Sequence, residues 1–474
     1  MSIRTHNRIK LIGVIAMGIV VAAIGLFVSA ALFQVALQKR FEPVPLPASY
    51  PHAANQVEAD RQDLDYLEQL MHLDRSFSPA AREQFEQERT ALMQRNTQLS
   101  KPQFQLAIDH LVALANNGHT STLASQRAGR FGRAQVRFAW FGDDLYIVRT
   151  KSDVKHLLGA RVLMIDCRDI ATAIAAARPY VTGIDHYAKW YSLPLLEMPE
   201  LLHAIWPDAD PEGLTLRVLT LDGKQTETRV TVDVPHENRN KLVPIRDIAP
   251  AQIPDDTTGW QTFLSDNGAL PLSLREPNRS LFSSELANDT LYIRINQVLP
   301  DSYGSLKQQL AELMRQSAGS SWQHIILDLR FNTGGNYLET TVFTHDLHRC
   351  LRPEGKLSIL IGNMTFSAAI VTAARAKYFT RRQVELVGES VGDRDQYWAE
   401  RGERLRLPNS GIQIGYATAM HDSVHECYDP ARCYWLDFVY GVPAGTLEPD
   451  RRITWAFADY VKGQDTVLNS VLRN

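Results

Sequence analysis

Residues 357–379 read LSILIGNMTFSAAIVTAARAKYF, and this stretch decides the fold. The short apolar run at 358–361 is typical of a buried strand, and the alanine-rich stretch 367–378 predicts a helix soon after it. Ser367 would then open the helix, beside its free N–H groups and the positive end of its dipole. Nucleophilic serines of other hydrolases occupy such turns, although G-x-S-x-G is absent here. A plain helix cap is the alternative role for Ser367, and caps are the commoner of the two.

Strand and helix patterns alternate on both sides of that stretch. The predicted strands are 291–295, 325–329, 358–361 and 384–387, and the predicted helices are 303–317, 337–351 and 367–378. Alternation of this kind indicates an α/β layer architecture. We therefore expect an α/β catalytic domain at residues 237–474.

A second informative stretch, ILDLRFNTGGNYLE, covers residues 326–339. Asp328 and Arg330 flank the expected end of a strand, and Gly334 and Gly335 let the backbone come close to a bound group. One use of such a turn is to offer a backbone N–H to a developing oxyanion. An ordinary strand-to-helix turn is the other.

A candidate base lies far upstream of that serine. His119 stands in NNGHTST, after the expected end of a helix and before polar residues, where a loop histidine could reach a nucleophile. A third residue would orient the histidine, and Glu389 in VGES, just past a strand end, is the candidate carboxylate. Asp393 and Asp395 compete with Glu389 for that role.

The N-terminal segment 11–37 contains no charged residue. A helix of that length reaches about 40 Å, which exceeds the ~30 Å hydrocarbon core of a bilayer. A secretory signal has a shorter apolar region, so the segment is typical of a retained transmembrane anchor. Small residues at 29–31 nevertheless leave cleavage open. Basic residues in the tail 1–10 favour a cytoplasmic N-terminus, which puts everything beyond a proline-rich linker at 38–54 outside the cytoplasm.

Residues 55–117 read as helical, because apolar residues recur there at three- and four-residue steps. Ser100 and Gln103 are spaced as a capping box at the start of one helix. Gly118 suits the left-handed position that ends a helix. We expect a helical N-terminal region that stops just before His119.

Residues 118–236 read as a β-rich region. The predicted strands are 135–141, 145–149, 162–165, 214–219 and 226–232, with hairpin signals at 142–144 and at 222–223. The intervening stretch 180–212 is rich in Tyr, Trp, Leu and Pro, and we expect it to pack irregularly.

Composition sets several classes of protein aside. The 474 residues include 50 basic and 53 acidic side chains, a net charge of −3, whereas a nucleic-acid binder usually shows a basic excess. No motif indicates a metal or an organic cofactor. Cys427 and Cys433 lie close together in ECYDPARCYW, where they form either a disulfide in an oxidising compartment or two buried thiols. Oligomeric state stays open.

Taken together, these stretches resemble the S41 serine peptidases, the family of the C-terminal processing (tail-specific) proteases and the tricorn protease core. The matching segments are NNGHTSTL, LLGARVLMIDCRDI, LYIRINQV, HIILDLRFNTGGN, GNMTFSAAIVTAA, LVGESVGD, LPNSG and the closing run LEPDRRITWAFADYVKGQDTVLNSVL. The similarity covers about residues 60–474. DLRFNTGG followed by TFSAA about thirty residues later is its most specific part.

The resemblance implies a crotonase-like α/β catalytic core and a degenerate PDZ-like module within the β-rich region. The site residues that it implies are the nucleophile Ser367, the base His119, the carboxylate Glu389 and the oxyanion-hole amides of Gly334, Gly335 and Ala368. Processing proteases use a Ser-Lys dyad instead, with the lysine about 25 residues after the serine. Here that stretch reads ESVGDRDQYW and contains no lysine. Lys377 is only ten residues on, within the predicted helix, so a Ser-His-carboxylate mechanism remains.

The resulting expectation is a membrane-anchored serine peptidase that acts on peptides or proteins outside the cytoplasm, at a bacterial inner membrane facing the periplasm. A catalytically inactive scaffold that binds peptides in the cell envelope is the alternative, motivated by the missing lysine and the altered G-D-R-D segment.

Overall fold

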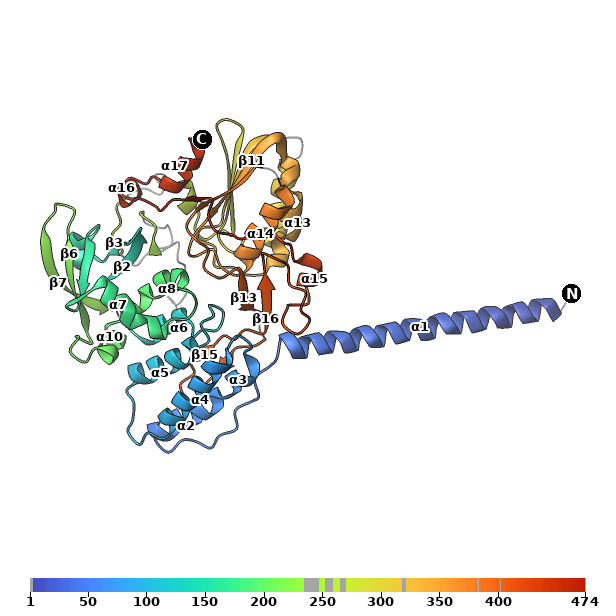
Figure 1. The fold of residues 1–474 in the computed structure, drawn as a ribbon, viewed down its shortest axis with the longest axis horizontal. Coiled ribbons are helices and arrows are strands. Elements are labelled where there is room, and N and C mark those ends of the chain that lie inside the picture. The colour runs from blue at the N-terminus through green and yellow to red at the C-terminus, as the bar shows by residue number, and fades with distance from the viewer. Residues whose placement is uncertain are drawn as a thin grey trace.

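The structure is a computed structural model that describes residues 3–233, 247–251, 259–264, 270–317, 321–381, 383–400 and 402–473. The start of the expected catalytic domain, 237–246, lies outside the described residues. Within them the chain is a mixed α/β protein with one long N-terminal helix, α1 (Ile3–Phe41), standing out from the body (Figure 1).

The central sheet has six strands in the order β17-β12-β11-β10-β9-β8. They are β8 (Leu281–Leu286), β9 (Thr290–Ile295), β10 (Trp322–Asp328), β11 (Leu351–Ile361), β12 (Val384–Gly388) and β17 (Arg451–Arg452). All neighbouring pairs are parallel except β8 with β9. The four strands predicted between 291 and 387 are thus confirmed, and so is the α/β alternation.

Side chains alternate between the two faces of this sheet, and each face has its own helical cover. Ile325, Leu327 and Ile359 pack toward α12 (Leu306–Gln316), α13 (Thr341–Asp346) and α14 (Ala368–Thr380). Ile326 and Leu360 pack toward α17 (Thr466–Leu472) on the opposite face, as Figure 1 shows. The sheet is buried on both faces, which explains why its strands read as continuous apolar runs.

A second sheet of seven strands forms the β-rich region, in the order β1-β7-β6-β4-β3-β2 with β5 paired to β4. Its strands are β1 (Arg133–Ala134), β2 (Val136–Phe141), β3 (Asp144–Thr150), β4 (Arg161–Ile165), β5 (Arg168–Asp169), β6 (Gly213–Leu219) and β7 (Gln225–Asp233). The five predicted strands are confirmed. The expectation of irregular packing in 180–212 is wrong.

That stretch forms three short helices, α8 (Asp185–Tyr191), α9 (Leu193–Leu196) and α10 (Pro199–Ile205). Pro194 and Pro199 stand in the first turns of the last two helices, where a missing N–H costs nothing. Leu195, Leu201 and their apolar neighbours are fully buried in the core of the β-rich region. The prolines that suggested irregular chain therefore start helices.

The helical N-terminal region consists of α2 (Gln56–Leu67), α3 (Gln69–Leu73), α4 (Pro79–Met93) and α5 (Lys101–Ala113). The capping box at the start of α5 is formed as predicted, with Ser100 and Gln103 bonding each other's backbone N–H. These helices share a core with Leu405, Leu407 and Ile414 from the C-terminal part of the chain. The helical N-terminal region and the expected catalytic domain therefore share one hydrophobic core.

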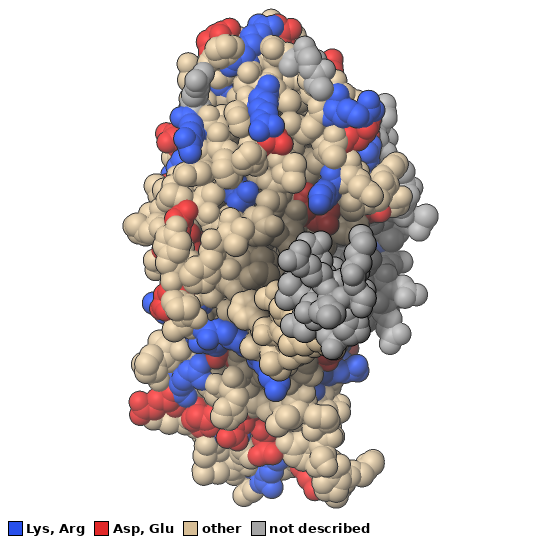
Figure 2. All heavy atoms as spheres, turned by 90° about the vertical axis from the view of Figure 1, so that its right-hand side faces the viewer, with Lys and Arg blue, Asp and Glu red and all other residues tan. Residues whose placement is uncertain are grey.

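Helix α1 continues beyond the predicted anchor 11–37 and ends in the body of the protein. An apolar span of mean hydropathy 2.4 lies within Val20–Phe41, which is long enough to cross a membrane. Phe41 is only 3% exposed and makes an edge contact with Tyr434. The expected linker thus begins as helix, and its first residues are docked. On the face from which α1 leaves, basic and acidic side chains are interspersed among the residues drawn in colour (Figure 2).

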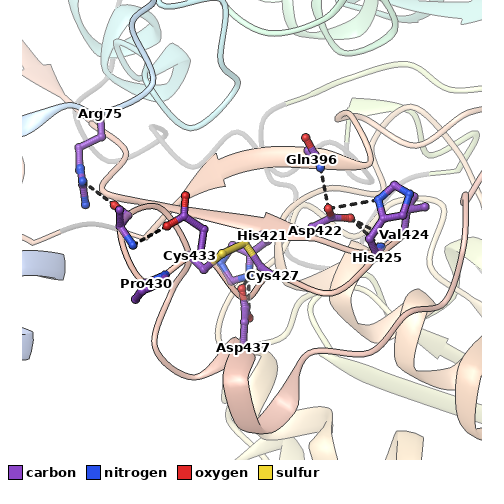
Figure 3. The surroundings of a disulfide bond; sticks show 12 residues. Arg75, Gln396, His421, Asp422, Val424, His425, Cys427, Pro430, Cys433 and Asp437 are labelled. Atoms are coloured by element: carbon purple, nitrogen blue, oxygen red, sulfur yellow. Dashed lines mark hydrogen bonds and ion pairs between the residues drawn. A yellow bond between two sulfur atoms is a disulfide. The ribbon is translucent and has the colours of Figure 1, made fainter.

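Cys427 and Cys433 form a disulfide with a Cα–Cα distance of 5.5 Å. The bond closes a short loop beside β16 (Ala419–Asp422), close to His421 and Asp437 (Figure 3). Of the two alternatives for these cysteines, the disulfide is the one the structure contains. Cys167 and Cys350 are unpaired.

Candidate active site

The candidate site lies where three parallel strands of the central sheet end. β10, β11 and β12 stop at Asp328, Ile361 and Gly388, which share one edge of the sheet. The turns that follow carry the segments 329–335, 362–367 and 389–393. Ligands of open α/β sheets usually bind at this edge.

Ser367 has a backbone conformation that few residues other than glycine adopt, with φ 56° and ψ −125°. Such a conformation costs about 1–3 kcal/mol and persists only where the surroundings enforce it. The side chain does not cap α14, and within the described residues its hydroxyl has no hydrogen-bond partner. The helix-cap role is therefore not the one that Ser367 performs. Its hydroxyl lies at the start of α14 and has no hydrogen-bond partner among the described residues.

Two backbone amides beside Ser367 are also without acceptors in the described part of the chain, those of Ala368 and Gly335. The amide of Gly334 is used, because it donates to Asn332 Oδ1 at 2.9 Å. Gly334 instead lets the turn pass close to Ser367, because it has no side chain. A Cβ there would lie 2.6 Å from the Ser367 Cβ, so no other residue fits without displacing the serine.

The turn that carries these glycines is tied to the segment before Ser367. Asn332 accepts a hydrogen bond from the backbone N–H of Phe366 at 3.0 Å and donates to the Ile295 carbonyl at 2.9 Å. Thr365 receives the Gly362 N–H and donates to the Leu329 carbonyl. Both loops of the site are thus fixed to one another by buried hydrogen bonds.

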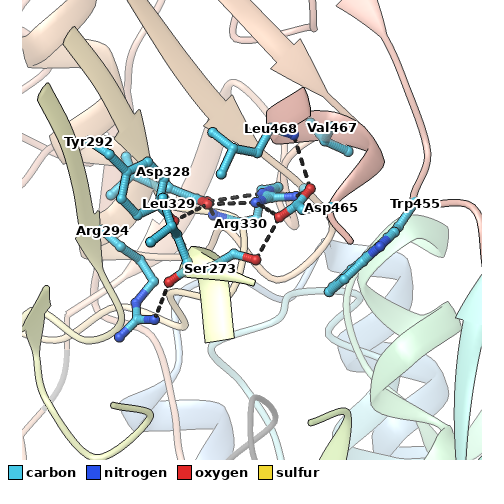
Figure 4. A network of polar contacts seen from close by, with 12 residues as sticks. Ser273, Tyr292, Arg294, Asp328, Leu329, Arg330, Trp455, Asp465, Val467 and Leu468 are labelled. Carbon is cyan, nitrogen blue, oxygen red and sulfur yellow. Dashed lines mark hydrogen bonds and ion pairs between the residues drawn. The ribbon is translucent and has the colours of Figure 1, made fainter. Parts of the chain in front are cut away.

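Asp328 and Arg330, singled out in the sequence, form the anchor beneath that turn (Figure 4). Arg330 binds Asp328 at 2.6 Å and Asp465 at 2.7 Å, all three being buried. Asp465 also accepts from the Ser273 hydroxyl at 2.6 Å. Burial alone would raise the pKa of Asp465, but Arg330 holds it below its usual value. These residues fix the turn and do not reach the site.

His119 follows the N-terminal helices and lies between two aromatic rings. Phe366 stacks on it with ring centroids 4.3 Å apart, and Tyr397 stacks at 5.6 Å. Both ring nitrogens are buried and have no hydrogen-bond partner among the residues that the structure describes. Gly118 is not left-handed as predicted, a role that Asn116 takes with φ 46°. A Cβ on Gly118 would instead meet the Phe366 ring at 2.7 Å, so this glycine makes room for the stack.

Asp393 is the carboxylate beside His119. Its Oδ2 lies 3.6 Å from His119 Nδ1, which is longer than a hydrogen bond, and its side chain is 1% exposed. No other carboxylate in the described residues comes within ion-pair distance of this ring. Glu389 directly follows β12 and lines a different cavity from the one that Ser367 and His119 share. Of the three carboxylates considered for this position, Asp393 is thus the one beside His119, and neither Glu389 nor Asp395 makes an ion pair with the ring in the described residues.

Ser367 and His119 line one cavity of about 550 Å³, together with Gly335. The walls include Tyr187 and Trp190 from the β-rich region. Two segments almost 250 residues apart are thus brought to a common hollow. The sequence reasoning did not find Asn332, Phe366 or Tyr397; Asn332 could have been singled out inside the DLRFNTGG stretch, whereas nothing local marks Tyr397.

Comparisons with known proteins agree with this arrangement at the level of fold. No family model and no curated protein matches the chain. Among solved structures, a serine-to-alanine mutant of CPAF matches with a TM-score of 0.53 at 14% identity, over 86% of this chain and 95% of that chain. Mature CPAF complexed with lactacystin matches with a TM-score of 0.51 at 12% identity, over 86% and 96%.

The photosystem II D1 C-terminal processing protease matches at a TM-score of 0.36 and 12% identity, over 87% of this chain and 98% of that chain. The two CPAF matches show that this chain shares the fold of CPAF, which supports the resemblance to the S41 peptidases that the motifs indicated.

Proposed function

We propose that this chain is a serine peptidase of S41 type that uses Ser367 as nucleophile and His119 as general base. The observation that carries the proposal is the backbone of Ser367. A strained serine at a helix start, whose hydroxyl neither caps the helix nor bonds elsewhere in the described protein, has no evident structural purpose. Strain of this kind concentrates at active sites.

In the proposed reaction, Ser367 Oγ attacks the carbonyl carbon of a peptide bond, and His119 accepts the hydroxyl proton. The oxygen of the tetrahedral intermediate takes the negative charge and receives the free N–H groups of Ala368 and Gly335. His119 then gives its proton to the leaving amine, and a water molecule repeats the sequence to release the acyl group. Asp393 orients the imidazole and stabilises it when it is charged.

A histidine base fits the walls of the cavity better than a lysine base does. No lysine lines the cavity of Ser367 in the described part of the chain. Lys377 donates to the Thr446 carbonyl at 2.7 Å and is engaged away from the hydroxyl. The long distance between His119 and Asp393 is typical of free enzymes, whose catalytic hydrogen bonds often tighten only with substrate.

Peptides or proteins are the proposed substrates, and α1 is the proposed membrane anchor with the body outside the cytoplasm. The disulfide near β16 supports an oxidising compartment. A PDZ-like role for the seven-stranded sheet stays a prediction. Anchoring is tested by a chain that starts at Gln38: it should leave the membrane fraction, whereas continued sedimentation with membranes would contradict the anchor.

Hydrolysis is tested with the purified full-length chain in detergent and a mixture of unrelated peptides. Cleavage products should accumulate with wild type and not with Ser367→Ala, and both proteins should melt at similar temperatures. Cleavage that persists in Ser367→Ala would rule out this nucleophile. An intact wild type that binds peptides without cutting them would indicate the inactive scaffold.

A further inference from the structure

A second cavity, of about 110 Å³, lies behind the loop that leads to Ser367. Its walls come from the β2–β3 hairpin, from α8 and α9, and from the ends of β11 and β12. Trp190, Leu193 and Met364 line both this cavity and the cavity of Ser367. The two hollows therefore adjoin, and a peptide held across Ser367 has a neighbouring space for one of its side chains.

Glu389, which the proposed mechanism does not use, faces this second cavity. Within the described residues its carboxylate makes no ion pair and no side-chain hydrogen bond. Burial raises the pKa of Glu389 above its usual value. Lys189, Arg452 and Arg330 lie near enough to attract this carboxylate, but none of them forms an ion pair with it in the described residues. A half-buried carboxylate without a direct ion-pair partner is costly, and a bound cation would reduce that cost.

The positive groups in the same walls are already engaged. Lys189 donates to Asp143 and to the Gly142 carbonyl, each at 2.9 Å. Arg330 is held between its two buried aspartates. Glu389 is thus the charged group of this cavity that remains open to a ligand.

Aromatic rings form much of the remaining wall, and the N–H groups of two of its indoles already donate hydrogen bonds within the protein. The indole N–H of Trp190 donates to the Asn363 carbonyl and that of Trp455 to the Gln464 carbonyl, each at 2.9 Å. These indoles therefore offer ring surface and no donors for an anion. Ring faces attract cations, and a carboxylate beside them fixes the charged end.

We propose that this cavity is a specificity pocket that takes the basic side chain, lysine or arginine, of a peptide bound across Ser367. The aliphatic stem of such a side chain would lie against the indoles of Trp190 and Trp455, and its charge would meet Glu389. The assignment rests on the proposed peptidase function, whose substrate class it narrows.

The test compares peptides that differ at one residue, lysine against norleucine, placed in turn at each position around a bond that the full-length protein cleaves. At one position wild type should favour lysine in kcat/KM. Glu389→Gln should lower that preference roughly tenfold to a hundredfold, mainly through KM, because a charge-assisted contact is lost. Glu385→Gln is the matched control: this residue lies on β12, which Glu389 directly follows, but it pairs with Arg451 outside the cavity, so the preference should stay as in wild type.

Equal losses of kcat/KM with both peptides in Glu389→Gln would assign the residue a structural role and overturn the pocket. A preference for lysine that is unchanged in Glu389→Gln would also overturn the pocket. A failure of hydrolysis itself is distinguished by binding. Tryptophan fluorescence should report saturable binding of the lysine peptide that is weaker for the norleucine peptide and for Glu389→Gln. That result would keep the pocket even if nothing is cleaved, and equal binding of both peptides would overturn it.

Discussion

Two histidines lie on either side of Tyr397, and they are treated oppositely by the fold. His119 stacks on one side at 5.6 Å and has no hydrogen bond to either nitrogen. His421 stacks on the other side at 5.4 Å and is held by Asp437 at 3.0 Å and Glu400 at 3.1 Å. The His119 imidazole lines a cavity and has no hydrogen bond in the described residues, whereas the His421 imidazole is paired with two carboxylates.

The difference separates a histidine that is paired with two carboxylates from one whose ring has no hydrogen-bond partner in the described residues. Burial alone would lower the pKa of His421, but Asp437 and Glu400 raise it to about 10, so the ring stays a cation at neutral pH. A permanent cation cannot accept a proton. His119 keeps both nitrogens available, at the cost of leaving them unbonded in a buried place. Proteins tolerate that cost mainly at functional sites.

The largest effect should come from the open histidine. His119→Ala should lower kcat/KM by about four powers of ten, because the base is lost, and should leave the melting temperature within a few degrees of wild type. Steady-state peptide hydrolysis and thermal unfolding measure the two quantities. The exposed histidine of α13 provides the control, since His345→Ala should change neither. A variant of His119 that retains most of its activity would remove this residue from the mechanism.

His421, which is paired with Asp437 and Glu400, should instead matter mainly for stability. His421→Gln removes the cation between two carboxylates and should lower the free energy of unfolding by roughly 3 kcal/mol, measured by denaturant titration. His425→Gln is the neighbouring control: its side chain is 75% exposed and meets Asp422 at 3.4 Å. Loss of an exposed pair should cost less than about 1 kcal/mol. Equal effects in the two variants would contradict a structural role for the His421 cluster.

Asp393 should matter next, and only for turnover. Asp393→Asn keeps the shape of the side chain but removes the charge beside His119, and kcat should fall by at most the ~10⁴-fold that loss of a triad carboxylate costs. Asp395→Asn, two residues on, tests whether proximity along the chain is sufficient and should leave kcat near wild type. If Asp395→Asn were the more damaging change, the orienting carboxylate would have been assigned to the wrong residue.

The smallest effect concerns pH and again sharpens the comparison. The pKa of His421 is raised on folding, from an ordinary value near 6.5 to about 10. Its contribution to stability is therefore fully present below about pH 6.5 and is lost as the pH rises toward 10. The stability difference between wild type and His421→Gln should narrow over that interval, because the folded protein loses there the proton that His421 carries. Denaturant titrations at several pH values test this, and a difference that grows with pH would contradict it.

Much of this contrast could be predicted from the sequence, and some of it could not. Strand periodicity located the three strand ends, and the motif at 357–379 identified Ser367 before any geometry was known. His119 was found because it ends a helical region in a polar loop. Local patterns place residues along the chain in this way, but they do not show which segments meet across the fold.

The carboxylate shows the limit most clearly. Glu389 and Asp393 both follow β12, and four residues of turn decide which of them faces His119 and which faces the second cavity. The neighbours of each side chain, such as His119 beside Asp393, come from segments that are distant in the sequence. The docking of Phe41 against Tyr434 was missed for the same reason, since the partner lies almost 400 residues away.

We expect the Ser367 hydroxyl to react as an activated nucleophile with His119 as its base. A fluorophosphonate probe, followed by mass spectrometry of the digested full-length protein, tests it directly. We expect one adduct, on the peptide that contains Ser367. It should form much more slowly in His119→Ala and should be absent in Ser367→Ala. An adduct on another serine, or labelling of Ser367 that proceeds equally fast without His119, would contradict it.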